Sequence, residues 1–195
     1  MKKTILFFVA LILIWVGYMA WPLYDLYRVA RAIERRDIET VARHVDFHRT
    51  RQSFTQQIVQ SYLQRTGARV GPLVQGAAVS IADPLVEKMI SRDALAELLR
   101  VGWPVGALPD RPHETMGLSV QSLGTLWDVF DSSEYGIGRY EVSVPVTFPK
   151  ERALGLQFRL AGWRWRLSGV ELPQHILVPL TDEIIKQTKP NPTAQ

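Results

Sequence analysis

The chain has 195 residues, of which 47% are apolar and 22% charged, and it carries a formal net charge of +4 with no cysteine. This length and balance fit one globular domain with a short appendage, and they argue against a disordered chain, a disulfide scaffold or a polytopic membrane protein. The charge is unevenly distributed, because residues 71–135 hold 9 acidic and 4 basic side chains.

An uncharged run after Lys2 and Lys3 predicts a transmembrane signal anchor over residues 1–21. The run extends from Thr4 to Leu23, and a helix of about 18 to 20 apolar residues crosses most of a hydrocarbon layer about 30 Å thick. We expect residues 4–21 to contact the membrane. A cleaved signal peptide and a buried core helix remain the alternatives. Cleavage requires small residues at the first and third places before the cut, and a cut after Ala20 or Gly17 would put Tyr18 or Trp15 in the third place.

The flanks of this run predict its orientation. Lys2 and Lys3 form a short head of the kind that stays in the cytoplasm, although several arginines follow the run as well. We therefore expect a single-pass inner-membrane protein whose remaining residues lie in the periplasm, where the absence of cysteine is compatible with an oxidising compartment. Aromatic residues mark the far interface: Trp15, Tyr18, Trp21 and Tyr24.

Helical spacing of apolar residues predicts a helical half over residues 22–102 of an exported domain that ends at residue 188. The pattern of residues 24–44 breaks at Arg36, and Asp37 is expected to cap a helix that starts at Ile38. A third helix is expected from Thr50 to Gly67.

Further helical stripes follow before the predicted loop over residues 103–117. One covers residues 70–81, a second starts after Asp83 and Pro84, and a third is capped by Ser91 and ends at Gly102. Proline and glycine are frequent in residues 103–117, which predicts a connection between two halves.

The second half, residues 118–172, changes its apolar period from 3.6 to 2, which predicts antiparallel strands. Alternation over residues 140–148, 154–160 and 163–168 and a shorter strand over residues 126–130 give a meander of roughly four strands. A helix over residues 175–188 and a disordered tail over 189–195 complete the chain. The predicted class is α+β, with helices on one face of the sheet. The residues expected to pack on these helices are Tyr140, Val144, Phe158, Trp163 and Trp165.

The same alternation places Arg159, Arg164 and Arg166 on the other face of the sheet. Pairing Leu160 with Trp163 across a turn at Ala161 and Gly162 would put Arg159 opposite Arg164. Like charges in that position call for an acidic neighbour or an anionic ligand, so the face is a candidate anion-binding or partner-binding surface. The alternative is a solvated face with surface ion pairs.

Other chemistry finds little support in the sequence. His44, Asp46 and His48 form H-x-D-x-H, but no third ligand is evident, so we expect no metal and no cofactor. There is no cysteine nucleophile, serine elbow or phosphate-binding loop, and we expect no enzyme activity. Alternation separates the tryptophans of residues 163–166 from the arginines, which argues against nucleic-acid binding.

A signature between residues 22 and 53 gives the chain a family resemblance. It comprises P-L-Y-D-L-Y over residues 22–27, Ala32-Ile33, Asp37, Val45-Asp46-Phe47, Arg51 and Ser53. With these residues the chain resembles the proteobacterial family called domain of unknown function 2939, which implies an anchored protein and no catalytic residues. Its layout resembles cone-shaped folds of the nuclear transport factor two or cystatin kind.

The residues of this motif also have a structural interpretation. Asp37 caps a helix, Phe47 fills the core between helices, Asp46 accepts a helix-terminal amide or pairs with Arg51, and Ser53 bonds to nearby backbone.

We therefore expect a membrane-anchored periplasmic domain that acts as a binding or interaction module, with an envelope protein as its partner. A small-ligand carrier or enzyme with a pocket between the sheet and the helices is the alternative, and a structural subunit of an envelope complex is a third possibility.

Overall fold

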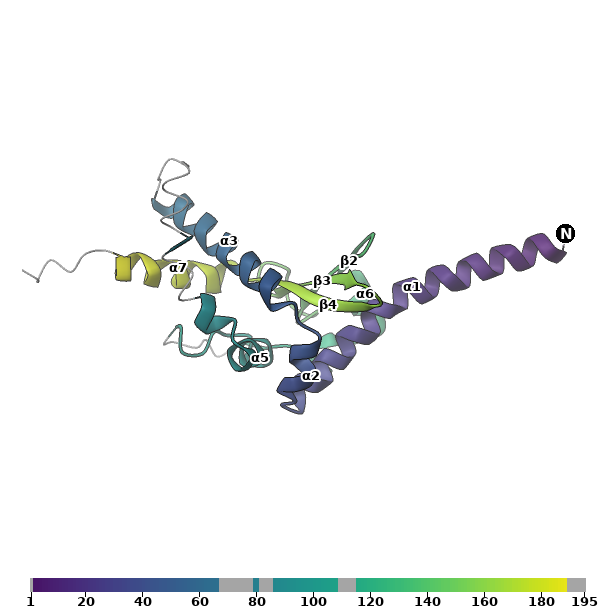
Figure 1. The fold of residues 1–195 in the computed structure, drawn as a ribbon, viewed down its shortest axis with the longest axis horizontal. Helices are drawn as coiled ribbons and strands as arrows, with labels where there is room; N and C mark the ends of the chain where they lie inside the picture. Colours follow the sequence, from purple (N-terminus) through teal and green to yellow (C-terminus); the bar gives the residue numbers. More distant parts are fainter. Residues whose placement is uncertain (1, 67–78, 81–85, 109–114, 189–195) are drawn as a thin grey trace, which may run out of the picture.

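The computed structural model describes residues 2–66, 79–80, 86–108 and 115–188. The long apolar helix at the N-terminus projects from a domain of helices and one antiparallel sheet (Figure 1). The predicted α+β class is thereby confirmed.

The elements are α1 (Lys2–Glu34), α2 (Ile38–Arg43), α3 (Phe47–Thr66), α5 (Arg92–Val101), η1 (Gln121–Leu123), α6 (Leu126–Asp131), β1 (Ser133–Gly136), β2 (Arg139–Val144), β3 (Leu154–Ala161), β4 (Arg164–Glu171) and α7 (Gln174–Thr188).

Helix α1 is one element that serves both the apolar run and the domain core. Its first half contains a stretch long and apolar enough to cross a membrane, none of which is buried. From Tyr18 onward one side becomes buried in the domain, and the helix continues through Pro22 to Glu34. The exposed run is thus not a buried core helix of the described fold.

Local sequence signals set the ends of several helices. Helix α1 ends in a left-handed residue, Arg36 (φ 56°), and the Asp37 amide donates to the Ala32 carbonyl at 2.9 Å, which is the pattern of a Schellman motif. Asp37 then caps α2 by accepting from the Thr40 amide at 3.0 Å. Ser91 caps α5, and Gly102 ends it with φ 71°. The predicted caps at Asp37, Ser91 and Gly102 are confirmed.

The sheet has the strand order β1-β2-β3-β4, as the predicted meander requires. Strand β2 ends at Val144, before Pro145, and does not continue to residue 148. The β3–β4 register differs from the predicted one by two residues, because the turn is formed by Gly162 and Trp163 and not by Ala161 and Gly162. A shift of two leaves the side chains that remain within the strands on their predicted faces, whereas Trp163 moves from the strand into the turn.

Two sequence predictions in this half are wrong. Residues 126–130 do not form a strand but lie in helix α6, which a capping box begins: the Thr125 hydroxyl accepts from the Asp128 amide and the Asp128 carboxylate accepts from the Thr125 amide. Trp163 does not pack in the core, because it stands in the β3–β4 turn and is 82% exposed.

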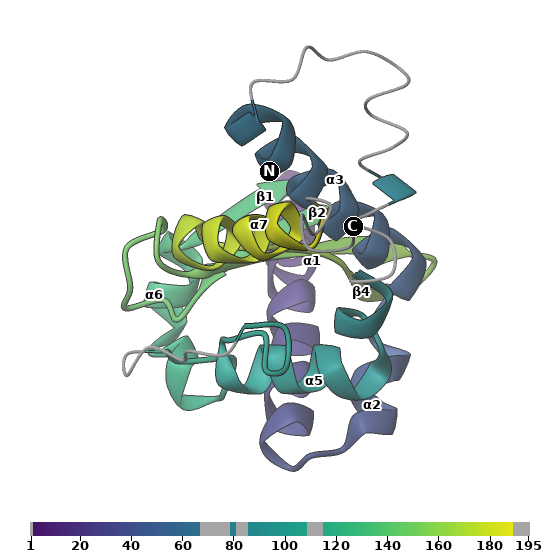
Figure 2. The same cartoon turned by 90° about the vertical axis from the view of Figure 1, so that its left-hand side faces the viewer.

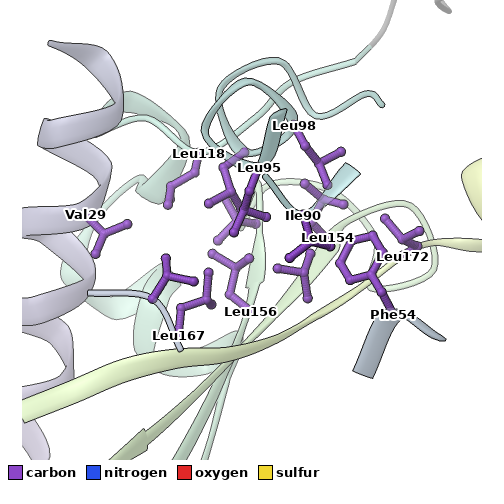
Figure 3. Close-up of a cluster of buried hydrophobic side chains, with 14 of the residues drawn as sticks. Val29, Phe54, Ile90, Leu95, Leu98, Leu118, Leu154, Leu156, Leu167 and Leu172 are labelled. Atoms are coloured by element: carbon purple, nitrogen blue, oxygen red, sulfur yellow. The ribbon is translucent and has the colours of Figure 1, made fainter. Parts of the chain in front are cut away.

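The core lies between one face of the sheet and helices α1 and α5. Figure 2 shows α1, α2 and α5 together on one side of the sheet. Helix α3 packs against β4 and α7 packs against α3, and both helices contribute buried side chains to the same core. Figure 3 shows Val29 of α1 and Leu95 of α5 approaching Leu156 and Leu167 of the strands. Tyr140, Val144, Phe158 and Trp165 are buried in this core as predicted. We call this face of the sheet the inner face and the opposite one the outer face.

Several sequence predictions fall wholly or partly outside the described residues. These are the stripe over residues 70–81, the start of a helix at Asp83 and Pro84, part of the 103–117 connection, and the tail over residues 189–195.

Candidate functional site

A groove whose lining includes four arginines and one aspartate, Asp46, lies on the outer face of the sheet. Strand pairing sets Arg139 of β2 opposite Arg159 of β3, and Arg159 opposite Arg166 of β4, so three adjacent strands carry a row of guanidinium groups. Arg49 of α3 lies beside the row and pairs with Asp46 at 3.3 Å. We call Arg49, Arg139, Arg159 and Arg166 the basic groove.

The structure changes the membership of the predicted arginine face. Arg159 and Arg166 come together in the groove, but Arg164 does not oppose Arg159; its strand partner is Ala161, and its side chain lines a different hollow beside α1. Arg139, which the sequence analysis missed, completes the row. Within the described residues no acidic side chain forms an ion pair with Arg159, Arg164 or Arg166. Asp46 lines the groove but pairs with Arg49, and Glu141 pairs with Arg139 at 3.5 Å.

The other end of the outer face is acidic. A hollow there is lined by Glu134, Glu141 and Glu171, and Lys150 reaches Glu134 at 3.2 Å. Burial and the neighbouring Glu171 carboxylate raise the pKa of Glu141. The outer face is therefore polarised, with positive charge toward the β1–β2 and β3–β4 turns and negative charge toward the β2–β3 connection.

Replacing Glu141 with glutamine should change how stability depends on pH. Relative to wild type, the free energy of unfolding of the variant should be higher at neutral pH than in mild acid. A raised folded pKa means that the native state binds more protons than the unfolded state, so the contribution of this group to wild-type stability increases as pH falls toward 4.5, the ordinary pKa of a glutamate. The variant lacks this increase. Urea midpoints of both proteins across this range test the prediction; a variant that shows the same pH dependence as wild type would contradict it.

A second hollow lies between α1, the end of α2 and the β3–β4 turn, and it is lined by Arg28, Arg43 and Arg164. At its base lies Asp25, 5% exposed, whose carboxylate accepts from the Trp165 amide at 3.2 Å. His44 Nε2 is 4.0 Å from the same carboxylate. Asp25 thus joins α1 to the edge of β4, a role for the D of P-L-Y-D-L-Y that the sequence analysis did not assign.

Replacing Asp25 with leucine should lower the free energy of unfolding by about 1–3 kcal/mol, because the buried Trp165 amide loses its acceptor. Asp25→Asn keeps a carbonyl oxygen at this position and should lose less. Urea unfolding of the full chain in mild detergent measures both. Equal losses in the two variants would show that the hydrogen bond is not the source of the stability.

The remaining motif residues have structural positions. Asp46 accepts from the Arg49 amide at 3.1 Å at the start of α3 and pairs with Arg49, not with Arg51 as predicted. Phe47 is partly buried against the core. The Ser53 hydroxyl accepts from the Gln57 side chain at 3.3 Å, where we had expected a backbone partner.

The H-x-D-x-H residues do not converge. His44 Nδ1 lies 2.8 Å from the Thr40 carbonyl oxygen, and His48 Nε2 lies 3.1 Å from the Gln52 side-chain nitrogen. Among the described residues no group of three or more His, Cys, Asp or Glu side chains could hold a metal ion.

Comparison with known proteins gives a family and no function. No curated protein and no solved structure matches the chain. One family model does match, over residues 11–98, and it is described as a protein of unknown function, DUF2939. This range runs from the apolar half of α1 through most of α5 and includes the motif between residues 22 and 53. The match to this family model over residues 11–98 confirms the resemblance that the motif predicted.

Proposed function

We propose that this protein is a single-pass, membrane-anchored module of the cell envelope whose periplasmic domain binds an anionic partner through the basic groove. The observation that carries the proposal is the continuity of α1, which passes unbroken from an exposed apolar stretch into the domain core. A helix built in this way holds the domain at the membrane at a fixed angle. The proposal also follows the orientation that Lys2 and Lys3 favour.

A binding module is favoured over a carrier or an enzyme by what fills the space between the sheet and the helices. That space is occupied by apolar side chains, including Val29, Leu95, Leu118 and Leu156, each at most 1% exposed. A carrier pocket would need room and converging polar groups there. The hollows that carry charge lie on the outer face and beside α1.

The basic groove supports an anionic partner. Adjacent arginines on paired strands repel one another unless a counter-charge lies nearby. Arg159 and Arg166 have no acidic partner among the described residues. An anionic group from outside would supply the counter-charge and accept hydrogen bonds from more than one guanidinium.

A pair of reporters fused after Gln195 tests the anchored, exported topology. Alkaline phosphatase, which is active only after export, should be active, and a fluorescent protein that matures only in the cytoplasm should stay dark. The unfused protein should remain in membranes after alkaline carbonate extraction at the mass of the uncleaved chain. An active cytoplasmic reporter, or a soluble chain shortened near residue 20, would contradict the proposal.

A further inference from the structure

The two turns at one end of the sheet lie beside the apolar half of α1. The Gly138 amide in the β1–β2 turn donates to the Tyr18 hydroxyl at 2.9 Å. In the β3–β4 turn, Trp163 stacks on Trp21 with ring centroids 6.3 Å apart. Helical side chains lean toward the N-terminus of their helix, so both turns lie level with Tyr18 and Trp21 or slightly farther along the apolar run (Figure 1).

The length of the apolar part of α1 places the β1–β2 and β3–β4 turns at the membrane surface. The fully exposed stretch from Thr4 to Gly17 has 14 residues and rises about 21 Å, whereas the hydrocarbon layer is about 30 Å thick. The difference must come from the turns of α1 that follow Gly17, or from local thinning of the bilayer. In either case the two sheet turns reach the boundary between hydrocarbon and head groups.

The side chains at the turns suit this position. Ile137, between Gly136 and Gly138, is fully exposed, and Trp163 is 82% exposed. These two apolar side chains are free to enter a lipid layer, and tryptophan prefers the interface between lipid and water.

The basic groove lies directly behind these turns. Arg139 is the first residue after the β1–β2 turn, and the Leu160 amide donates to the Gly138 carbonyl at 3.0 Å, which places Arg159 at nearly the same height. Arg164 is the first residue after the β3–β4 turn. Arginines that follow apolar turn tips lie where phosphate groups begin. The acidic hollow, by contrast, lies at the end of the sheet away from these turns.

We infer that the β1–β2 and β3–β4 turns form a second membrane contact, in which Ile137 and Trp163 enter the interface and the arginines of the basic groove, with Arg164, bind the head groups of anionic phospholipids. This inference rests on the proposed anchor and names the anionic partner of its basic groove. The domain is then held to the bilayer at α1 and at both turns, with its acidic end away from the membrane.

Single-cysteine variants test this contact, because the natural chain has no cysteine. The full chain is labelled with an environment-sensitive fluorophore at Ile137→Cys or Trp163→Cys and reconstituted into vesicles of phosphatidylcholine with phosphatidylglycerol. Ile12→Cys reports on the apolar half of α1, and Glu151→Cys reports on the far end of the sheet. Quenching is measured with lipids that carry a nitroxide near the head group for residues 137, 151 and 163, and with lipids that carry it deep in the acyl chain for residue 12.

Labels at residues 137 and 163 should be quenched several-fold more strongly than the label at residue 151. The difference should shrink in pure phosphatidylcholine and in the Arg139→Gln, Arg159→Gln, Arg166→Gln triple variant, whose thermal unfolding should match that of the labelled parent.

If the label at residue 12 is quenched but the labels at residues 137 and 163 are quenched no more than the label at residue 151, the second membrane contact is wrong and the anchor stands. If residue 12 is not quenched either, the anchor itself fails. Equal quenching with and without phosphatidylglycerol would overturn the binding of anionic head groups.

Discussion

Replacing Trp165 with alanine is expected to lower the free energy of unfolding by about 3–5 kcal/mol, the cost typical of removing a large buried aromatic side chain. Trp165 is 2% exposed and packs edge to face against Tyr18 of α1 and Tyr140 of β2, with centroid distances of 6.2 and 6.5 Å. It therefore joins α1 to the sheet as well as filling the core. Urea unfolding of the full chain in mild detergent, followed by circular dichroism, measures the loss.

Trp163→Ala is the matched control, because it removes the same side chain two residues away in the same hairpin. Trp163 is 82% exposed and stacks on Trp21, so its removal should lower the free energy of unfolding by about 0.5–1.5 kcal/mol, well below the loss at Trp165. Similar losses in the two variants would contradict the assignment of Trp165 to the core and Trp163 to the surface.

Gly117→Ala should destabilise the domain by about 3 kcal/mol or more, because the added methyl group has no space. A Cβ at this position would lie 2.2 Å from the Leu99 carbonyl oxygen and 2.4 Å from the Arg100 carbonyl carbon, which are backbone atoms at the end of α5. The Leu118 amide donates to the same Leu99 oxygen at 2.6 Å, so the segment cannot move away without losing that bond.

Gly136→Ala serves as the control for this substitution. The nearest atoms to a Cβ at Gly136 are 3.7 Å away, an ordinary contact, and its φ is not positive. Its melting temperature should stay close to that of wild type, while that of Gly117→Ala falls by many degrees. A Gly117→Ala variant as stable as the Gly136→Ala variant would show that the α5 contact can relax.

Much of the fold could be predicted because its signals are local. Asp37, Ser91 and Gly102 act on backbone groups within a few residues of themselves, so their identity alone indicates helix ends. Strict alternation likewise separated the inner and outer faces of β2, β3 and β4. The period of two is a property of each strand and needs no knowledge of its neighbours.

The errors arose where two structures share one local pattern. Residues 126–130 are too few for their period to separate a strand from a helix, and the capping pair Thr125 and Asp128 was the available signal. The predicted and observed β3–β4 registers differ by two residues and place the strand side chains on the same faces of the sheet. The alternation of apolar and polar residues therefore could not distinguish them. Glycine at the first position of a two-residue turn favours Gly162-Trp163 over Ala161-Gly162, and Gly162 does have φ 65°.

The candidate site was predicted in part for the same reason. Arg159 and Arg166 were placed on one face by alternation, but only the correct register sets them opposite each other and brings in Arg139. Asp25 could not be assigned from the sequence, because its partner, the Trp165 amide, lies 140 residues away along the chain. Pro22 has no backbone donor, yet α1 tolerates the loss of that one hydrogen bond and continues.

The central claim is that α1 is one rigid helix shared by the anchor and the domain, and a distance measurement tests it most directly. Spin labels at Val16→Cys in α1 and Glu151→Cys beyond the sheet, in the full chain in lipid vesicles, report their separation by double electron–electron resonance. We expect one narrow distribution centred on the separation in the structure. A broad or multiple distribution would mean that the helix bends or breaks between Val16 and the domain, and would contradict the claim.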